Sequence, residues 1–305
     1  MQKEKLNVAL FSILAAVFLT GSKLIIGLLT GSLGILSEAL HSALDMVAAV
    51  ITYFSVRVSD KPADQHHHFG HGKVENFSAL AETVLLLITC FWIIYEAFNR
   101  LMTGNTHIEI SIWSYVVVIG SIIIDVTRSR ALMRVAKKFN SQALEADALH
   151  FSTDIWSSAV VLLGLICANF GYFFADSIAA LGVSIIVLTI SYRLGKKAID
   201  ALLDKAPLEI IDQIKEILKE FKEVKHCHGL KVRSAGADTF IKVNVHLDPN
   251  LSLRKVHEIC DKIEKEIGFR IKRSEVAIHA EPHEPVHIKS ETTDPLLKSE
   301  KTDPL

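Results

Sequence analysis

Six apolar stretches, each long enough for a helix to cross a lipid bilayer, limit this chain more than any other feature. They cover residues 7–30, 33–57, 74–100, 112–135, 143–169 and 172–194. A hydrocarbon core of about 30 Å needs roughly 20 residues of helix. Half of the 305 residues are hydrophobic and the mean hydropathy is +0.33, which is high for a soluble protein of this length. We therefore predict an α-helical membrane protein with six transmembrane helices and membrane lipid as its surroundings.

The basic residues of the connecting segments predict the orientation. Lysine and arginine are frequent before the first stretch, between the second and third, between the fourth and fifth, and after the sixth. Two of the opposite connections, 30–32 and 169–171, carry none. Because cytoplasmic loops hold the excess of these residues, we expect both termini in the cytoplasm and a multi-pass protein of the cell (inner) membrane. The formal net charge of −1 argues against nucleic acid as a partner.

Beyond Pro207 the sequence changes to that of a soluble domain. Apolar residues recur at helical spacing over 208–221, which predicts a helix. Two runs of strand character follow at 229–234 and 239–247. Ser252 caps a second helix that runs to about Ile267, and 274–279 is a third strand. The order αββαβ predicts a small two-layer α/β domain. We place the six-helix domain at 1–206, a cytoplasmic metal-binding domain at 207–284 and a polar, disordered tail at 285–305.

Four ionisable residues lie inside two of the apolar stretches. His41 and Asp45 belong to the second stretch, and His150 and Asp154 to the fifth. Each pair has i, i+4 spacing, which places both members on one helical face, and both pairs fall near mid-membrane. Two imidazoles and two carboxylates suit a tetrahedral Zn²⁺ ion, whose charge the carboxylates balance. The alternative, two polar pairs that only pack helices, requires matched spacing and matched depth by coincidence.

Further acidic or basic residues lie within the predicted spans. Asp147 precedes His150 by one helical turn and could orient its ring. Asp125 and Arg128 make the second half of the fourth stretch the least apolar part of the predicted spans.

The loop before the third stretch carries a second set of metal-binding side chains. Asp64, His67 and His71 can meet if the loop bends, and the neighbouring glycines permit bending. A histidine-rich loop can equally be solvated and bind no specific ion.

The predicted soluble domain carries a third set. His246 and His279 end predicted strands and His257 begins a helix, so these side chains can converge at one edge of the domain. Singly, each would be an ordinary surface histidine. The full set is His228, His246, His257, His279 and Glu281.

One motif points toward an enzyme. His283-Glu-Pro-Val-His287 matches HExxH, a zinc-protease motif that must lie on a helix. Pro285 would interrupt that helix, so we expect no enzyme activity.

The two HxxxD pairs resemble those of the cation diffusion facilitators, and the segment from Asp64 to Lys73 is similar to that family's loop motif. The resemblance implies a homodimer with a metallochaperone-like cytoplasmic domain. It further implies that His41, Asp45, His150 and Asp154 form the transport site and that the cytoplasmic domain binds metal ions at its own histidines.

The resemblance also implies a divalent metal exporter, with Zn²⁺ as substrate and regulatory ligand and protons as the counter-ion. Metal ligands must be deprotonated, so binding of the ion releases protons. Two alternatives remain open on the residues alone: a passive divalent metal channel, and a membrane-anchored metal sensor.

Overall fold

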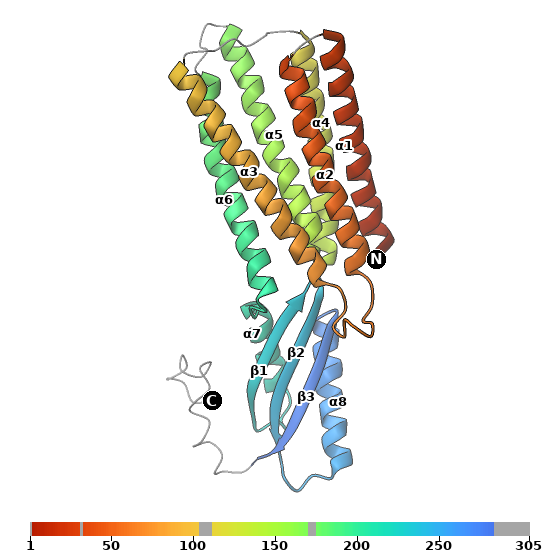
Figure 1. Cartoon of the computed structure of the whole chain (residues 1–305). Helices are drawn as coiled ribbons and strands as arrows, with labels where there is room; N and C mark the ends of the chain where they lie inside the picture. Colours follow the sequence, from red (N-terminus) through yellow and green to blue (C-terminus); the bar gives the residue numbers. More distant parts are fainter. Residues whose placement is uncertain (1, 31–32, 104–111, 170–174, 284–305) are drawn as a thin grey trace. The chain divides into compact units, whose positions relative to one another are not determined.

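The computed structural model describes residues 2–30, 33–103, 112–169 and 175–283 (Figure 1). The predicted tail, 285–305, lies outside the described residues. The chain divides between Leu203 and Asp204 into two compact units, three residues before the boundary that the sequence suggests.

Six long helices form the first unit, as the apolar stretches predict. The last one continues beyond residue 194 to Leu202, and Lys197 in its final turns pairs with Glu145 of α5 at 2.5 Å. The helices are α1 (Gln2–Thr30), α2 (Leu33–Ser59), α3 (Lys73–Thr103), α4 (Ile112–Phe139), α5 (Gln142–Asn169) and α6 (Ala175–Leu202). Helices α1 and α2, α4 and α5, and α3 and α6 pack as neighbours.

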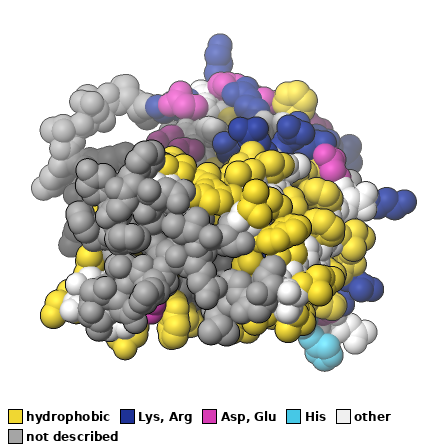
Figure 2. All heavy atoms as spheres, turned by 90° about the horizontal axis from the view of Figure 1, so that it is seen from above, with side chains coloured by type: hydrophobic (Ala, Val, Ile, Leu, Met, Phe, Trp, Pro, Cys, Tyr) yellow, Lys and Arg dark blue, Asp and Glu magenta, His cyan; other side chains and the backbone are white. Residues whose placement is uncertain are grey.

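The outside of this unit is apolar. Leu29 is 82% exposed and Met102 is 73% exposed, whereas Glu75, Glu82 and Asp147 are buried. Figure 2 looks onto the end of the bundle opposite the N-terminus, and hydrophobic side chains cover much of its described surface. Such an arrangement suits a hydrocarbon environment, because apolar patches of this extent are rare on soluble monomers.

Three segments within the described residues are long and apolar enough to cross a membrane by length and composition alone. Helix α4 is not among them, and it is less apolar than these three helices because it carries Asp125 and Arg128. The three segments are Lys3–Leu29, Ala39–Ser59 and Lys73–Asn99.

A buried polar cluster joins the helix ends near the N-terminus. Nζ of Lys5 donates to Asp60 at 2.7 Å and to Glu75 at 3.0 Å. Glu75 also accepts from the hydroxyls of Ser59, at 2.9 Å, and Ser141, at 2.5 Å. The cluster fastens α1, α2, α3 and the start of α5 to one another.

The second unit is the predicted αββαβ domain. Its elements are α7 (Leu208–Lys219), β1 (His226–Ala235), β2 (Asp238–Leu247), α8 (Leu253–Arg270) and β3 (Ser274–Pro282). The strand order is β1-β2-β3, with β2 antiparallel to β1 and, across the α8 crossover, parallel to β3. Ser252 caps α8 as predicted, since its hydroxyl accepts from the Lys255 N–H.

The two faces of this sheet differ. Ile241, Val243 and Val245 of β2 pack with apolar residues of α7 and α8 in one core. Successive side chains of a strand point to opposite faces. The alternate residues Asn244 and His246 therefore lie on the other face, together with His228 and Glu281.

Candidate metal centres

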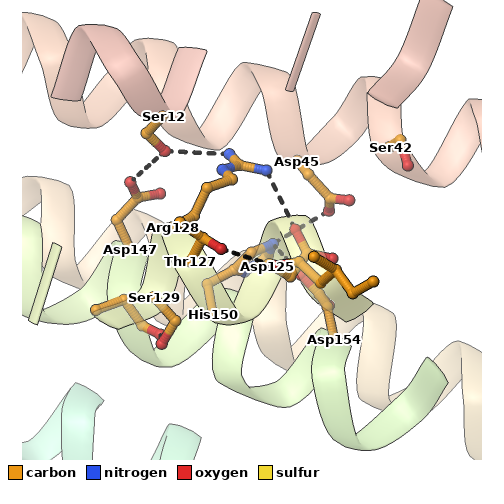
Figure 3. Close-up of polar contacts among 12 residues, drawn as sticks. Ser12, Ser42, Asp45, Asp125, Thr127, Arg128, Ser129, Asp147, His150 and Asp154 are labelled. Carbon is orange, nitrogen blue, oxygen red and sulfur yellow. Dashed lines mark hydrogen bonds and ion pairs between the residues drawn. The ribbon is translucent and has the colours of Figure 1, made fainter. Parts of the chain in front are cut away.

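The two pairs predicted inside the bundle meet between α2 and α5. Nε2 of His150 lies 3.1 Å from Oδ1 of Asp45 and 3.7 Å from Oδ2 of Asp154. Nε2 of His41 lies 3.8 Å from Oδ1 of Asp154 and 4.0 Å from Oδ1 of Asp45. The i, i+4 spacing thus turns each pair toward the other helix, as Figure 3 shows for Asp45, His150 and Asp154.

These separations suit a tetrahedral ion. Zinc bonds of 2.0–2.1 Å place neighbouring ligand atoms about 3.4 Å apart. His41, Asp45 and Asp154 each offer an atom within 4.8 Å of the others. Small side-chain rotations would therefore close the four groups around one ion. Asp45 is only 8% exposed and His150 only 2%, so the two carboxylates would balance the ion's charge largely away from bulk water.

A cavity of about 290 Å³ adjoins this cluster. His41, Asp45 and Asp154 line it, and so do Trp92 and Glu96 of α3. Trp92 and Glu96 lie in the half of α3 that ends at Thr103, on the side away from the N-terminal cluster. The ligand side chains therefore face a space that extends along one half of the bundle.

Further buried charges surround the ligands. Asp125 and Arg128 line the same cavity, as does Lys23, whose Nζ donates to Ser42 Oγ at 2.8 Å. Asp125 and Arg128 could be noticed in the sequence because they are ionisable residues within the fourth apolar stretch. Asp147 accepts from Ser12 Oγ at 3.1 Å, in place of the predicted contact with His150.

The loop set also comes together. His67 Nδ1 lies 3.2 Å from Asp64 Oδ1, and His71 Nε2 lies 3.4 Å from Asp64 Oδ2. Gly70, with a φ of 73°, provides the bend. The N–H groups of His66 and His67 donate to Asp64 and lower the pKa of this carboxyl to about 2. It therefore stays an anion, the form that binds metal, throughout the physiological pH range.

Three of the five predicted residues of the soluble unit form a third cluster. His246 Nε2 lies 3.1 Å from His228 Nδ1 and 3.4 Å from Glu281 Oε2. His279 lies next to it, with Nε2 3.5 Å from Glu281 Oε1, and its side chain is 65% exposed. His257 lies apart from the cluster on α8, is 75% exposed, and approaches Asp261 of its own helix at 3.6 Å.

Two further histidines, which are not among the five predicted ligands of this domain, border this cluster. The ring centroid of His246 lies 5.5 Å from that of His226 and 6.0 Å from that of His283. His226 is the cross-strand partner of His246, which strand register alone reveals. Of the HExxH segment, only His283 lies within the described residues.

Two family models match this chain, one in each of its two units. The model of the cation efflux transmembrane domain matches residues 9–203, and that of the cation efflux protein cytoplasmic domain matches residues 206–283. The chain belongs to the cation diffusion facilitator family. The resemblance noted in the motifs is thereby confirmed, as is the fold class. The protein is a multi-pass membrane protein of a transporter family, which supports the expectation that it is not an enzyme.

Curated relatives match over most of their length. The cation-efflux pump FieF of Shewanella oneidensis is 32% identical over 272 residues, which is 89% of this chain and 92% of that protein. The FieF of Citrobacter koseri is 33% identical over 256 residues, covering 83% and 84%. Among solved structures, the metal-bound C-terminal domain of the CzcD transporter from Thermotoga maritima is 34% identical, covers 25% of this chain and 88% of that one, and has a TM-score of 0.24.

Proposed function

We propose that this protein exports Zn²⁺ from the cytoplasm in exchange for protons, through a site made of His41, Asp45, His150 and Asp154. The observation that carries the proposal is the convergence of these four side chains, from two helices, at 3.1–4.0 Å beside a cavity. The relatives named as cation-efflux pumps support the export of a cation. The donor set of two imidazoles and two carboxylates favours Zn²⁺ over harder ions such as Mg²⁺ and Mn²⁺.

The exchange follows from the chemistry of the ligands. A metal ion binds imidazole nitrogens and carboxylates only in their deprotonated forms, so an ion arriving from the cytoplasm displaces protons. When the site faces the other side, protons compete for the same nitrogens and oxygens and release the ion. One site that alternates between the two sides therefore couples the two flows.

The other two clusters have supporting roles in this proposal. Asp64, His67 and His71 collect metal at the cytoplasmic entrance. In this homodimer, the domain 207–284 binds regulatory Zn²⁺ through His228, His246, His257, His279 and Glu281. Both termini are cytoplasmic, and the domain 1–206 lies in the cell membrane.

Reconstituted liposomes test the proposal. The full-length protein, in sealed vesicles that contain a pH-sensitive dye, should move Zn²⁺ and protons in opposite directions. It should transport Mn²⁺ more slowly than Zn²⁺. A passive channel would move the ion without proton counterflow. A membrane-anchored sensor would bind Zn²⁺ but move neither ion, and either result would replace our proposal.

A further inference from the structure

Arg128 is a buried arginine that the proposed site does not use. Its Nη2 donates to Ser12 Oγ of α1 at 3.1 Å, and its Nη1 donates to Asp125 Oδ1 at 3.4 Å. The guanidinium carbon lies 3.5 Å from the ring centroid of Phe151 on α5. Arg128 is 1% exposed and contacts α1, α5 and a residue of its own helix. Figure 3 shows its contacts with Ser12 and Asp125. Charged side chains within membrane spans are costly, and they generally have a function.

Arg128 lies at the inner end of the cavity. Along α4 the lining residues are Val118, Ser121, Asp125 and Arg128, and Arg128 is the one farthest from the start of the helix at Ile112. On α1 the lining residue nearest the N-terminus is Ala16. Arg128 contacts Ser12, which lies one turn closer to the N-terminus than Ala16 and does not line the cavity. The arginine therefore forms part of the wall where the cavity ends.

Two carboxylates lie beyond that wall. Asp147 and Glu82 are both 0% exposed, and neither lines the cavity. Asp147 contacts Ser12 and Glu82 contacts Thr52. One oxygen of each, Oδ1 of Asp147 and Oε2 of Glu82, has no hydrogen-bond partner among the described residues. These oxygens are well suited to attract a cation that passed Arg128.

We propose that Arg128 is the cation barrier of this transporter: its fixed positive charge keeps metal ions and protons in the cavity from passing to Asp147 and Glu82. Arginine suits this role because it keeps its proton at any physiological pH. Like charges repel strongly in a medium of low dielectric constant, and a single arginine can exclude cations from a selective pore. The inference rests on the proposed transport function. In an exchanger, unlike a channel, cations must not pass through the protein uncoupled, and Arg128 would prevent that passage.

Leak measurements test the barrier. Full-length Arg128→Gln is reconstituted in sealed liposomes with a pH-sensitive dye, no metal and an imposed membrane potential. We expect a proton leak several-fold above that of the wild type, and Zn²⁺ entry without a pH gradient. Arg128→Lys keeps the charge and should stay tight. Arg130→Gln is the matched control, because Arg130 is an exposed residue of the same helix that does not line the cavity.

A folded Arg128→Gln protein that is as tight as the wild type would overturn the proposal. If this variant does not fold because Asp125 loses its partner, the double variant Asp125→Asn, Arg128→Gln removes both charges of the pair. The double variant should also leak, and a tight double variant overturns the barrier equally. Wild-type exchange in the same liposomes tests the transport function separately, so the two ideas can fail independently.

Discussion

Asp154 is the proposed ligand whose loss is easiest to interpret, because its two oxygens face His41 and His150, at 3.8 and 3.7 Å. Asp154→Ala removes one ligand and one of the two charges that balance the ion. We expect Zn²⁺ uptake into liposomes to fall to background while the protein remains folded and dimeric by size-exclusion chromatography. Asp212→Ala, at an exposed position of α7, should transport normally. Wild-type uptake by Asp154→Ala would remove this residue from the site.

His41 should set the choice between metals. His41→Asp replaces a nitrogen ligand by a hard oxygen and adds a negative charge, which favours harder ions. In uptake assays with competing metals, Mn²⁺ should inhibit Zn²⁺ uptake by the variant at lower concentrations than it does in the wild type. Unchanged competition would indicate that His41 does not contact the ion, despite lining the cavity.

At the scale of helices, Glu75 should be the main support of the N-terminal polar cluster. Glu75→Ala leaves the buried Lys5 with Asp60 as its one anionic partner, and loss of one side of a buried pair costs up to about 3–5 kcal/mol. Thermal unfolding in detergent should shift downward accordingly. Glu4→Ala is the control, because its pair with Lys138 is about half exposed and such pairs contribute about 0–1 kcal/mol. Equal shifts in the two variants would show that the cluster does not stabilise the bundle.

The elements themselves were largely predictable. Apolar length predicts the six helices, and the i, i+4 spacing predicts that each ligand pair shares a face. The partner of Asp147 was not predictable, because Ser12 approaches it from a helix 135 positions away in the sequence. His226 was missed for a similar reason: it joins the histidines only through its pairing with His246 across two strands.

At the scale of the whole molecule, the two units should differ in how much transport depends on them. Asp45→Ala should abolish Zn²⁺ transport, because Asp45 lines the cavity and contacts His150. His246→Ala should only slow transport or shift its dependence on Zn²⁺, because a domain outside the membrane contains no path across it. The measurement is the initial rate of Zn²⁺ uptake by the full-length protein over a range of Zn²⁺ concentrations.

Lys231→Ala, at an exposed position on β1, serves as the control for the sheet. If Asp45→Ala and His246→Ala abolish transport equally while both proteins fold and assemble normally, the division into a transport site and a regulatory site is wrong.

The buried position of Lys5 has a practical consequence for anyone who labels or shortens this protein. Deleting the first five residues would leave the carboxylates of Asp60 and Glu75 without the cation that both of them contact. A bulky fusion partner placed directly before Lys5 would compete for the space in which four helix ends meet. Affinity tags and fluorescent reporters at the amino end therefore need a spacer. A low yield of folded protein with such a fusion would indicate a disturbed Lys5 cluster rather than a defect in metal transport.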